Sequence, residues 1–315
     1  MTDAFTEDEK KILEPYFTNL EKPVFAFTAK VPEEVIAVLF SKYSRSQHSI
    51  RKNFLDLVKD PGSGFKSILA TVSSNKSTDA PLSTLRTAGN EAFTAALAKA
   101  RDFFRRILVE YGDDSVGELG IAHVACEDVS QIAAKKLEDA RLISPLEKST
   151  RYVVFEKGKY YKPAAITNSK FAEDYAAICD ELFDVYSTQI EPMKAFAREK
   201  WPIAAFDLSG KKISEMTDEA EIKRAKPAYE SAVRARALDI LRYYLPAATV
   251  TNLGITANGR AFEYLISKLM SDELDEVRQI GQMMHEELSK VIPSLVKRAA
   301  ASNYFIETKK GMHTF

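Results

Sequence analysis

One short stretch of the chain brings together cations, hydroxyls and a carboxylate. Residues 141–152 read Arg-Leu-Ile-Ser-Pro-Leu-Glu-Lys-Ser-Thr-Arg-Tyr, and the key polar residues follow at steps of three, three, two and two: Arg141, Ser144, Glu147, Ser149 and Arg151. A guanidinium forms paired hydrogen bonds with phosphate oxygens, while hydroxyls and a carboxylate bind sugar or base edges. The stretch therefore suits a phosphorylated, hydroxyl-rich ligand. The alternative is a solvated helix end with ordinary surface charges.

Hydrophobic spacing predicts the elements that position this stretch. Residues 121–138 before it have a long apolar pattern that we interpret as helical. Residues 153–155 and 160–161 after it read as strands around a Lys-Gly turn. We therefore expect the stretch on a loop at a helix C-terminus, where rigid elements present binding residues.

Helical patterns dominate the rest of the chain, at residues 7–16, 32–40, 49–58, 89–111, 170–199, 227–244, 259–271 and 272–300. Thr6 and Glu9 form an approximate capping box, and residues 24–28 read as a strand. Residues 210–226 are expected to form an exposed insertion, and residues 61–84 a mobile region or lid. We predict an α+β fold, a helix-rich single large domain with a small antiparallel sheet. It would comprise an N-terminal extension with the mobile loop (1–85) and a main helical body (86–315).

Composition narrows the class of protein. The chain has 315 residues, 45% of them hydrophobic, which is enough to bury a substantial core. A net charge of −1 provides no global basic field, so we expect no nucleic-acid partner. No apolar run is long enough to span a bilayer and the N-terminus lacks a secretory pattern, so no membrane association is expected. Cys126 and Cys179 lie in apolar, helix-like contexts without CxxC spacing, which indicates buried free thiols and a cytoplasmic protein.

The four histidines are not spaced for a metal site. His123 lies in an apolar pattern that we interpret as helical, and we expect it to be a hydrogen-bonded core residue.

Residues 141–152 resemble the defining motif of flavin-dependent thymidylate synthases (ThyX), R-H-R-x-x-S-x-N-E-x-S-x-R-Y. Arg141 matches the third position, and the later hallmark positions are matched by Ser144, Glu147, Ser149, Arg151 and Tyr152. Asp139 and Ala140 stand where the family has Arg-His, and Leu146 replaces the asparagine.

A second segment, residues 111–118, resembles the family pattern H-G-H-x-(S/T)-P-x-E. Gly112, Ser115 and Glu118 match, whereas Asp113 replaces a histidine that helps to hold flavin in the family. The alternative is a helix ended by Gly112 and followed by a helix capped by an aspartate.

A third segment, residues 245–260, resembles the family pattern L-P-x-x-x-x-T-x-(F/W)-x-x-x-x-N-x-R. The matching residues are Leu245, Pro246, Thr251, Asn258 and Arg260. The resemblance implies that Asn258 and Arg260 border flavin and nucleotide, although Asn258 suits the N-cap of the following helix equally well. Asn252 replaces a nucleotide-binding arginine. Near the place of a second arginine, thought to polarise the pyrimidine, only Lys268 offers charge, and Lys268 is alternatively a solvated helix residue.

Residues 43–45, Tyr-Ser-Arg, weakly resemble an Arg-x-Ser element at the start of the family fold. Together with Arg51 and Lys52 they could form a phosphate-facing patch. A charge-rich helix start is the more common explanation.

The resemblance implies a homotetramer with FAD bound at subunit interfaces. The family transfers a methylene from methylenetetrahydrofolate to C5 of dUMP and reduces it with FADH2 that NADPH regenerates. By carry-over, Glu147, Ser149, Arg151 and Arg260 bind the dUMP-like nucleotide, and Ser149 and Lys268 are the catalytic candidates. The flavin-binding candidates are Arg141, Ser144, Asn258 and Ser115.

The departures from the family pattern leave three hypotheses open. Asp113 and Asp139 would place repulsion beside an anionic cofactor, since two like charges 4 Å apart cost about 4 kcal/mol at an effective dielectric constant near 20. The first hypothesis is a divergent enzyme in which Lys135, Lys136 and Lys148 replace the missing cations. The second is a non-catalytic paralogue that keeps a nucleotide site, and the third is an assembly or interaction module.

Overall fold

The computed structural model describes residues 4–28, 30–31, 36, 39–40, 46–59, 114–208 and 210–312. Several expectations lie outside these residues: the helix at 89–111, the mobile region at 61–84, the boundary between residues 85 and 86, most of the helix at 32–40, and the placements of residues 43–45 and Asp113.

A four-stranded antiparallel sheet with the order β1-β2-β6-β3 forms the centre of the described structure. Its strands are β1 (Val24–Ala26), β2 (Ile121–Ser130), β6 (Val250–Asn258) and β3 (Ile143–Glu147). The sheet confirms the α+β fold class and the strand expected near residue 24. The helical interpretation of residues 121–130 was wrong, because they form the long central strand β2.

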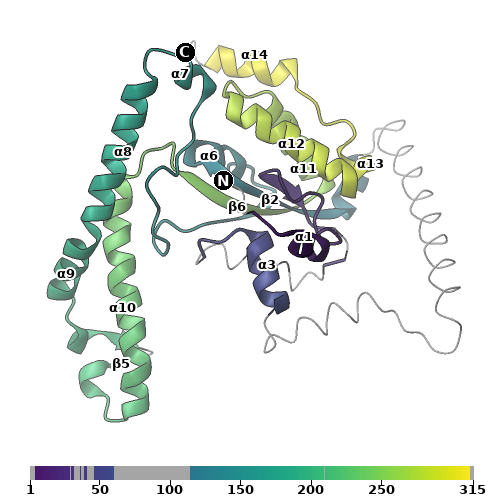
Figure 1. Ribbon diagram of the computed structural model, residues 1–315. Helices are drawn as coiled ribbons and strands as arrows, with labels where there is room; N and C mark the ends of the chain where they lie inside the picture. The colour runs from purple at the N-terminus through teal and green to yellow at the C-terminus, as the bar shows by residue number, and fades with distance from the viewer. Residues whose placement is uncertain are drawn as a thin grey trace, which may run out of the picture.

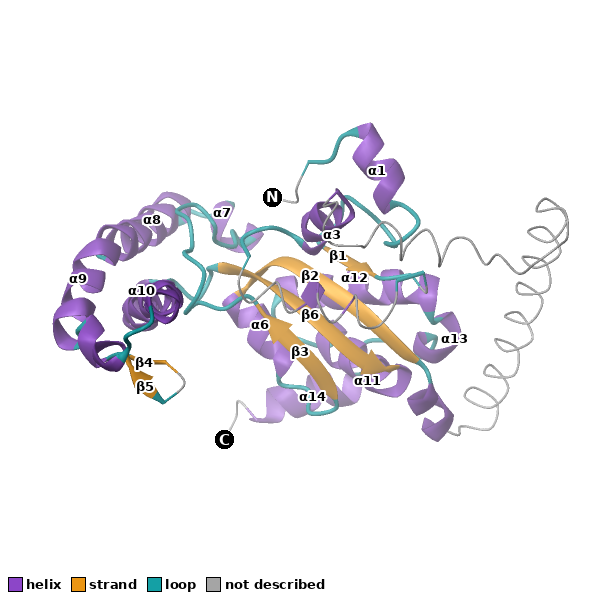
Figure 2. Ribbon diagram, turned by 90° about the horizontal axis from the view of Figure 1, so that it is seen from below, coloured by secondary structure: helices purple, strands orange, loops and turns teal. Residues whose placement is uncertain are grey.

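Helices cover one face of the sheet, as Figures 1 and 2 show. The apolar residues of β2 and β6 on this face form one core with α6 (Gln131–Glu138), α11 (Gly259–Met270) and α12 (Asp275–Val291). Helix α11 confirms the pattern at 259–271. The helix expected over 272–300 instead ends at Val291 and is followed by α13 (Pro293–Val296), then by α14 (Asn303–Met312).

The N-terminal elements pack on the opposite face, beside β1 and β2. Helices α1 (Glu7–Leu13) and α3 (Ile50–Lys59) form a second core around Phe25 and Ala125. Thr6 and Glu9 make both hydrogen bonds of the expected capping box. On this face the edge strand β3 keeps Ser144 and Leu146 exposed.

A helical arm projects from the sheet, and its two longest helices, α8 (Ala172–Thr188) and α10 (Glu219–Leu241), lie side by side (Figure 1). It also contains α7 (Ala164–Thr167), α9 (Ile190–Lys200) and a hairpin of β4 (Asp207–Leu208) and β5 (Lys211–Lys212). The helix expected over 170–199 is interrupted at Gln189, because Pro192 in the first turn of α9 has no N–H for a continuous helix. Helix α10 begins within the expected insertion, where Asp218 caps it.

The strands expected after the motif are absent from the described residues. Residues 153–155 form no strand, and Tyr160 makes only an isolated bridge to Thr249. Gly158, with φ of 82°, provides the expected turn.

Candidate functional site

Residues 141–152 form an edge strand with a turn at either end, not the loop expected at a helix C-terminus. Arg141 lies exposed in the turn before β3, and Ser144 lies within β3, opposite Thr256. Thr256 also pairs with His123 of β2, and the Nδ1 atom of His123 lies 2.8 Å from its hydroxyl oxygen. His123 is thus a hydrogen-bonded core residue as expected, although it lies in a strand.

Glu147 ends β3 and turns its carboxylate toward α6. Gln131 Nε2 donates to this carboxylate at 3.0 Å, and Lys135 Nζ lies 3.6 Å away. Burial raises the pKa of Glu147, and the nearby Glu138 raises it further. Two of the expected replacement cations are already paired with carboxylates. Lys135 pairs with Glu138 at 2.5 Å, and Lys136 pairs with Asp272 at 3.3 Å.

Arg151 belongs to a cluster of two arginines around one carboxylate. Arg151 Nε lies 3.2 Å from Asp239 Oδ1, and Arg242 Nη2 lies 3.1 Å from the same oxygen. The arginine side chains are 50% and 38% exposed, so a ligand can reach both. The closest contact of Asp239 with Arg151 is at Nε, on one edge of the guanidinium. The arrangement of two half-exposed guanidinium groups is of the kind that binds phosphate oxygens.

Sequence reasoning missed Arg242 and Asp239. The signal for Arg242 was its place three residues before Leu245-Pro246, the start of the third family-like segment. Ser149 has a local role here, because its hydroxyl accepts a hydrogen bond from the backbone N–H of Arg151 at 3.3 Å and so shapes the turn.

The other predicted residues gather at the opposite end of β3, near the start of α11. Asn258 caps α11, since its side-chain oxygen accepts from Ala261 N at 2.9 Å. Arg260 pairs with Glu118 at 2.5 Å, on the short 3-10 helix η3 (Asp114–Leu119) that also carries the exposed Ser115. The structure thus places Arg260 with the flavin candidates and away from Arg151.

These residues suit one wall of a flavin site. Arg141 offers an exposed guanidinium, Ser144 and Ser115 offer exposed hydroxyls, and the start of α11 favours anions. Asp139 ends α6 and is exposed, whereas Ala140 packs against the core. A site formed between subunits would require a second wall from another chain.

Lys268 lies near the other end of α11. It is eight residues from Arg260, about 12 Å along the helix axis at 1.5 Å per residue. Its ammonium lies 5.6 Å from the centre of the Tyr264 ring. The structure therefore does not bring Lys268 together with Arg260.

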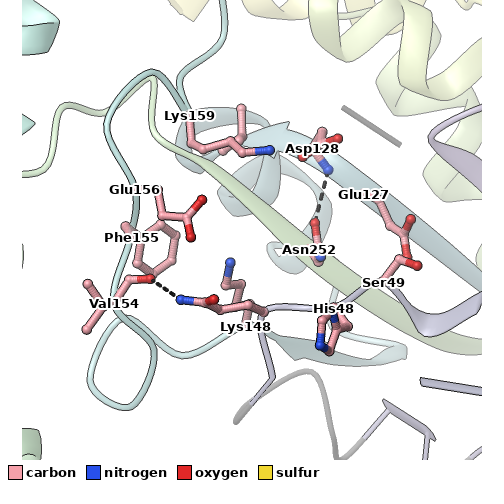
Figure 3. Close-up of a pocket in the computed structure, with 12 residues that line it drawn as sticks. His48, Ser49, Glu127, Asp128, Lys148, Val154, Phe155, Glu156, Lys159 and Asn252 are labelled. Atoms are coloured by element: carbon pink, nitrogen blue, oxygen red, sulfur yellow. Dashed lines mark hydrogen bonds between the residues drawn. The ribbon is translucent and has the colours of Figure 1, made fainter. Parts of the chain in front are cut away.

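A cavity of about 250 Å³ lies beside the second half of the motif (Figure 3). Lys148 lines it, and so does Asn252, at the position where the family has an arginine. Asn252 makes hydrogen bonds to the residues on either side of β6. Its backbone carbonyl accepts from Lys148 N at 2.9 Å, and its side-chain oxygen accepts from Asp128 N at 3.1 Å. Lys148, the third of the expected replacement cations, thus lines this cavity.

Three further features of the described residues concern metal binding, the cysteines and membrane spanning. They contain no group of three or more His, Cys, Asp or Glu side chains arranged to hold a metal. Cys126 and Cys179 are free and buried as expected, and burial raises the pKa of Cys126 to about 12. No helix in the described ranges is both long and apolar enough to cross a bilayer.

Known proteins resemble this chain over most of its length. A family model described as thymidylate synthase complementing protein matches residues 66–294. The chain is 38% identical over 319 residues to a UPF0159 protein of Chlamydia muridarum and 40% identical over 303 residues to one of Chlamydia pneumoniae. A UPF0159 protein of Thermoplasma acidophilum is 35% identical over 229 residues.

The alignments cover 98%, 94% and 70% of this chain, but only 53%, 50% and 46% of the respective relatives. The chain therefore spans about half the length of the curated relatives it matches.

Proposed function

The chain belongs to the family of thymidylate synthase complementing proteins, and we propose that it acts as a divergent flavin-dependent thymidylate synthase. The reaction is the reductive methylation of dUMP to dTMP. Methylenetetrahydrofolate is the carbon donor, and NADPH is the final reductant. We further propose a cytoplasmic homotetramer, in which a neighbouring chain completes the flavin site.

The cluster of Arg151, Asp239 and Arg242 carries this proposal. Two guanidinium groups and one carboxylate leave a net charge of +1, in a position that solvent reaches. Because Asp239 contacts the Nε edge of Arg151, it holds the terminal fork in an orientation suited to a phosphate dianion. Ser149 would orient the turn and offer its hydroxyl to the nucleotide. Glu147 would bind the nucleotide from the side of α6.

Arg141, Ser144, Ser115 and the capped start of α11 at Asn258 would hold FAD. When bound, FAD supplies the hydride equivalents that reduce the transferred carbon. The contribution of this chain is to bind and orient the two nucleotides and to offset their negative charge.

The second candidate is a non-catalytic paralogue that binds a nucleotide or assembles with another chain. It is favoured by the pairing of Arg260 with Glu118 and by the absence of a cation at Asp139, Ala140 and Asn252. A flavin spectrum of the purified protein separates the two candidates. The enzyme should show bound flavin or take up added FAD with quenching of the flavin fluorescence, and failure of both would refute the enzyme proposal.

Thermal unfolding with dUMP tests the nucleotide site directly. We expect saturating dUMP to raise the midpoint, since a ligand at 100 times its Kd stabilises the folded state by about 2.7 kcal/mol. Arg151→Ala and Arg242→Ala should each abolish most of the shift. Arg198→Ala is the matched control, because Arg198 is an exposed arginine paired with Glu230 at 2.7 Å on the arm. An unchanged shift in Arg151→Ala would place the nucleotide elsewhere.

A further inference from the structure

Helix α8, in the arm that projects from the sheet (Figure 1), is apolar on two neighbouring faces. One face is buried and forms the arm core with α10. The other carries Phe171 and Ile178, whose side chains are 56% and 57% exposed, together with the half-buried Leu182 and Val185. We call these four residues the α8 stripe. Exposed apolar side chains gathered on one helix face are typical of an interaction surface.

The spacing of the α8 stripe is that of a helix-pairing surface. Phe171, Ile178 and Val185 follow one another at steps of seven residues, and Leu182 is four residues after Ile178. Residues at steps of seven drift by only about 20° per step around an α-helix, so they form one continuous row. Such a row is the seam along which two α-helices pack. Between residues 171 and 185 it is about 21 Å long, at 1.5 Å per residue.

A row of carboxylates lies beside the α8 stripe. Asp174 and Glu181 are exposed, and they are four residues before and three residues after Ile178. No ion pair joins either of them to another described residue. Helix α8 contains five carboxylates and no lysine or arginine. Lys170 precedes the helix, and its ammonium lies 5.0 Å from the ring centre of Phe171. The stripe is therefore acidic along one side.

This charge pattern selects the kind of partner. A nucleic acid or an anionic lipid surface would bring phosphates beside the carboxylates. A second copy of α8 would bring two rows of carboxylates together, with no cation on either helix to pair with them. Charged residues that flank an apolar seam determine which helices pair. A helix that carries lysine or arginine beside its apolar row complements both the stripe and the carboxylates.

We propose that the α8 stripe docks a basic amphipathic helix of a partner protein. Apolar side chains of the partner pack between Phe171, Ile178 and Val185, and its lysine or arginine side chains pair with Asp174 and Glu181. A helix of about 14 residues is long enough to cover the stripe. The proposal uses none of the residues assigned to the nucleotide or the flavin.

Fluorescence polarisation with labelled helical peptides tests the surface on the full-length chain. The first peptide has 18 residues, with leucine alternating at steps of three and four residues and lysine at the other positions. The second peptide keeps the leucines and has glutamate in place of lysine. We expect the lysine peptide to bind saturably and the glutamate peptide to bind at least tenfold more weakly.

Variants of exposed residues assign the binding to the α8 stripe. Ile178→Ala and Glu181→Lys should each weaken binding of the lysine peptide at least fivefold. Glu173→Lys is the matched control for charge, because Glu173 is an exposed carboxylate of α8 that lies five residues before Ile178, about 140° around the helix. Phe196→Ala, at an exposed apolar residue of α9, is the control for apolar contact. Both controls should bind as the wild type does.

Sedimentation of the wild type and Ile178→Asp tests the alternative occupant, a second copy of this chain. We expect the same mass for both, and a lower mass for Ile178→Asp would assign the stripe to self-association and overturn the proposal. Three other results would also overturn it: no binding of the lysine peptide, equally tight binding of the glutamate peptide, or equal weakening by Glu173→Lys and Glu181→Lys. None of these readouts involves dUMP or FAD, so the proposed enzyme activity stands or falls separately.

Discussion

Arg51 and Glu127 form an ion pair whose side chains are 0% and 3% exposed. The guanidinium also lies 4.0 Å from the centre of the Phe25 ring, and Glu127 accepts a hydrogen bond from the backbone N–H of Ile50 at 2.9 Å. Glu127 immediately precedes Asp128, whose φ of 54° marks the bulge of β2 beside the cavity that Lys148 and Asn252 line. The buried pair therefore fixes the start of α3 against the wall of that cavity.

Removing one member of this pair should be costly. Arg51→Met leaves Glu127 charged and buried, and we expect a loss of about 3–5 kcal/mol in the free energy of unfolding. Arg51→Met with Glu127→Gln should recover much of that loss, because glutamine is neutral and still accepts from Ile50. Urea unfolding of both variants provides the test. A double variant less stable than Arg51→Met would show that the charge of Glu127 is not the source of the cost.

Glu147 gives stability a predictable dependence on pH. Because burial and Glu138 raise its pKa in the folded chain, the folded state holds its proton more tightly than the unfolded state. This contribution to stability is complete below the ordinary pKa of about 4.3 and is lost as the pH rises through the higher folded value. Glu147→Gln has no such loss, so its stability relative to wild type should increase with pH across this window.

Urea midpoints measured between acidic and neutral pH would show this trend. Glu230→Gln serves as a control of opposite sign, because the hydrogen bond from Arg198 lowers the pKa of Glu230. A relative stability of Glu147→Gln that is flat or falls with rising pH would contradict the prediction.

The sequence predicted the residue types of the site better than their partners. Arg51 was expected either in a phosphate-facing patch or at a charge-rich helix start, but its carboxylate partner is 76 residues away and both are buried. In the same way, the spacing of Arg151 suggested a phosphate site without indicating Asp239 or Arg242. Such partners depend on how distant elements pack, which local spacing does not encode.

At the scale of elements, two substitutions of Asn258 at the start of α11 distinguish a structural role of this residue from a binding role. Asn258→Ala removes the acceptor for Ala261 N, and we expect a loss of about 1 kcal/mol in unfolding free energy. Asn258→Asp should keep the cap and the stability, but place a negative charge on the wall of the proposed flavin site. If Asn258 also binds flavin, Asn258→Asp will fold normally and take up FAD more weakly. Equal FAD uptake by wild type and Asn258→Asp would leave the cap as its role.

Caps and short helices were predictable because their signals are local, as for Thr6, Asn258 and α3. Strand β2 was not, because it is central in the sheet, paired with β1 and β6, and buried on both faces. A strand of this kind lacks the alternation of apolar and polar residues and resembles a buried helix in sequence. Reading β2 as a helix also misplaced the motif, since the following α6 is short and leads directly into edge strand β3.

At the scale of the whole molecule, the described residues form separate apolar cores. The core between the sheet and α6, α11 and α12 includes Leu253 and Phe262, whereas the arm has its own core around Phe183, Tyr186 and Leu238. The arm also supplies Asp239 and Arg242 to the cluster with Arg151. If this cluster binds the nucleotide as proposed, its affinity depends on how firmly α10 is held against the turn that carries Arg151.

Weakening the arm core should loosen the arm before the sheet. Phe183 is completely buried, and Phe183→Ala should cost about 3–5 kcal/mol in the stability of the arm. Hydrogen exchange should become faster in α8 and α10 while the amides of β2 and β6 keep their protection, since regions with separate cores open independently. The dUMP-dependent rise in unfolding midpoint should also shrink, because Asp239 and Arg242 move with α10.

Leu253→Ala in the sheet core is the control and should instead accelerate exchange in β6. Equal acceleration of β6 by both variants would show that the arm and the sheet unfold as one unit, and would rule out independent movement of the arm as a regulator of nucleotide binding.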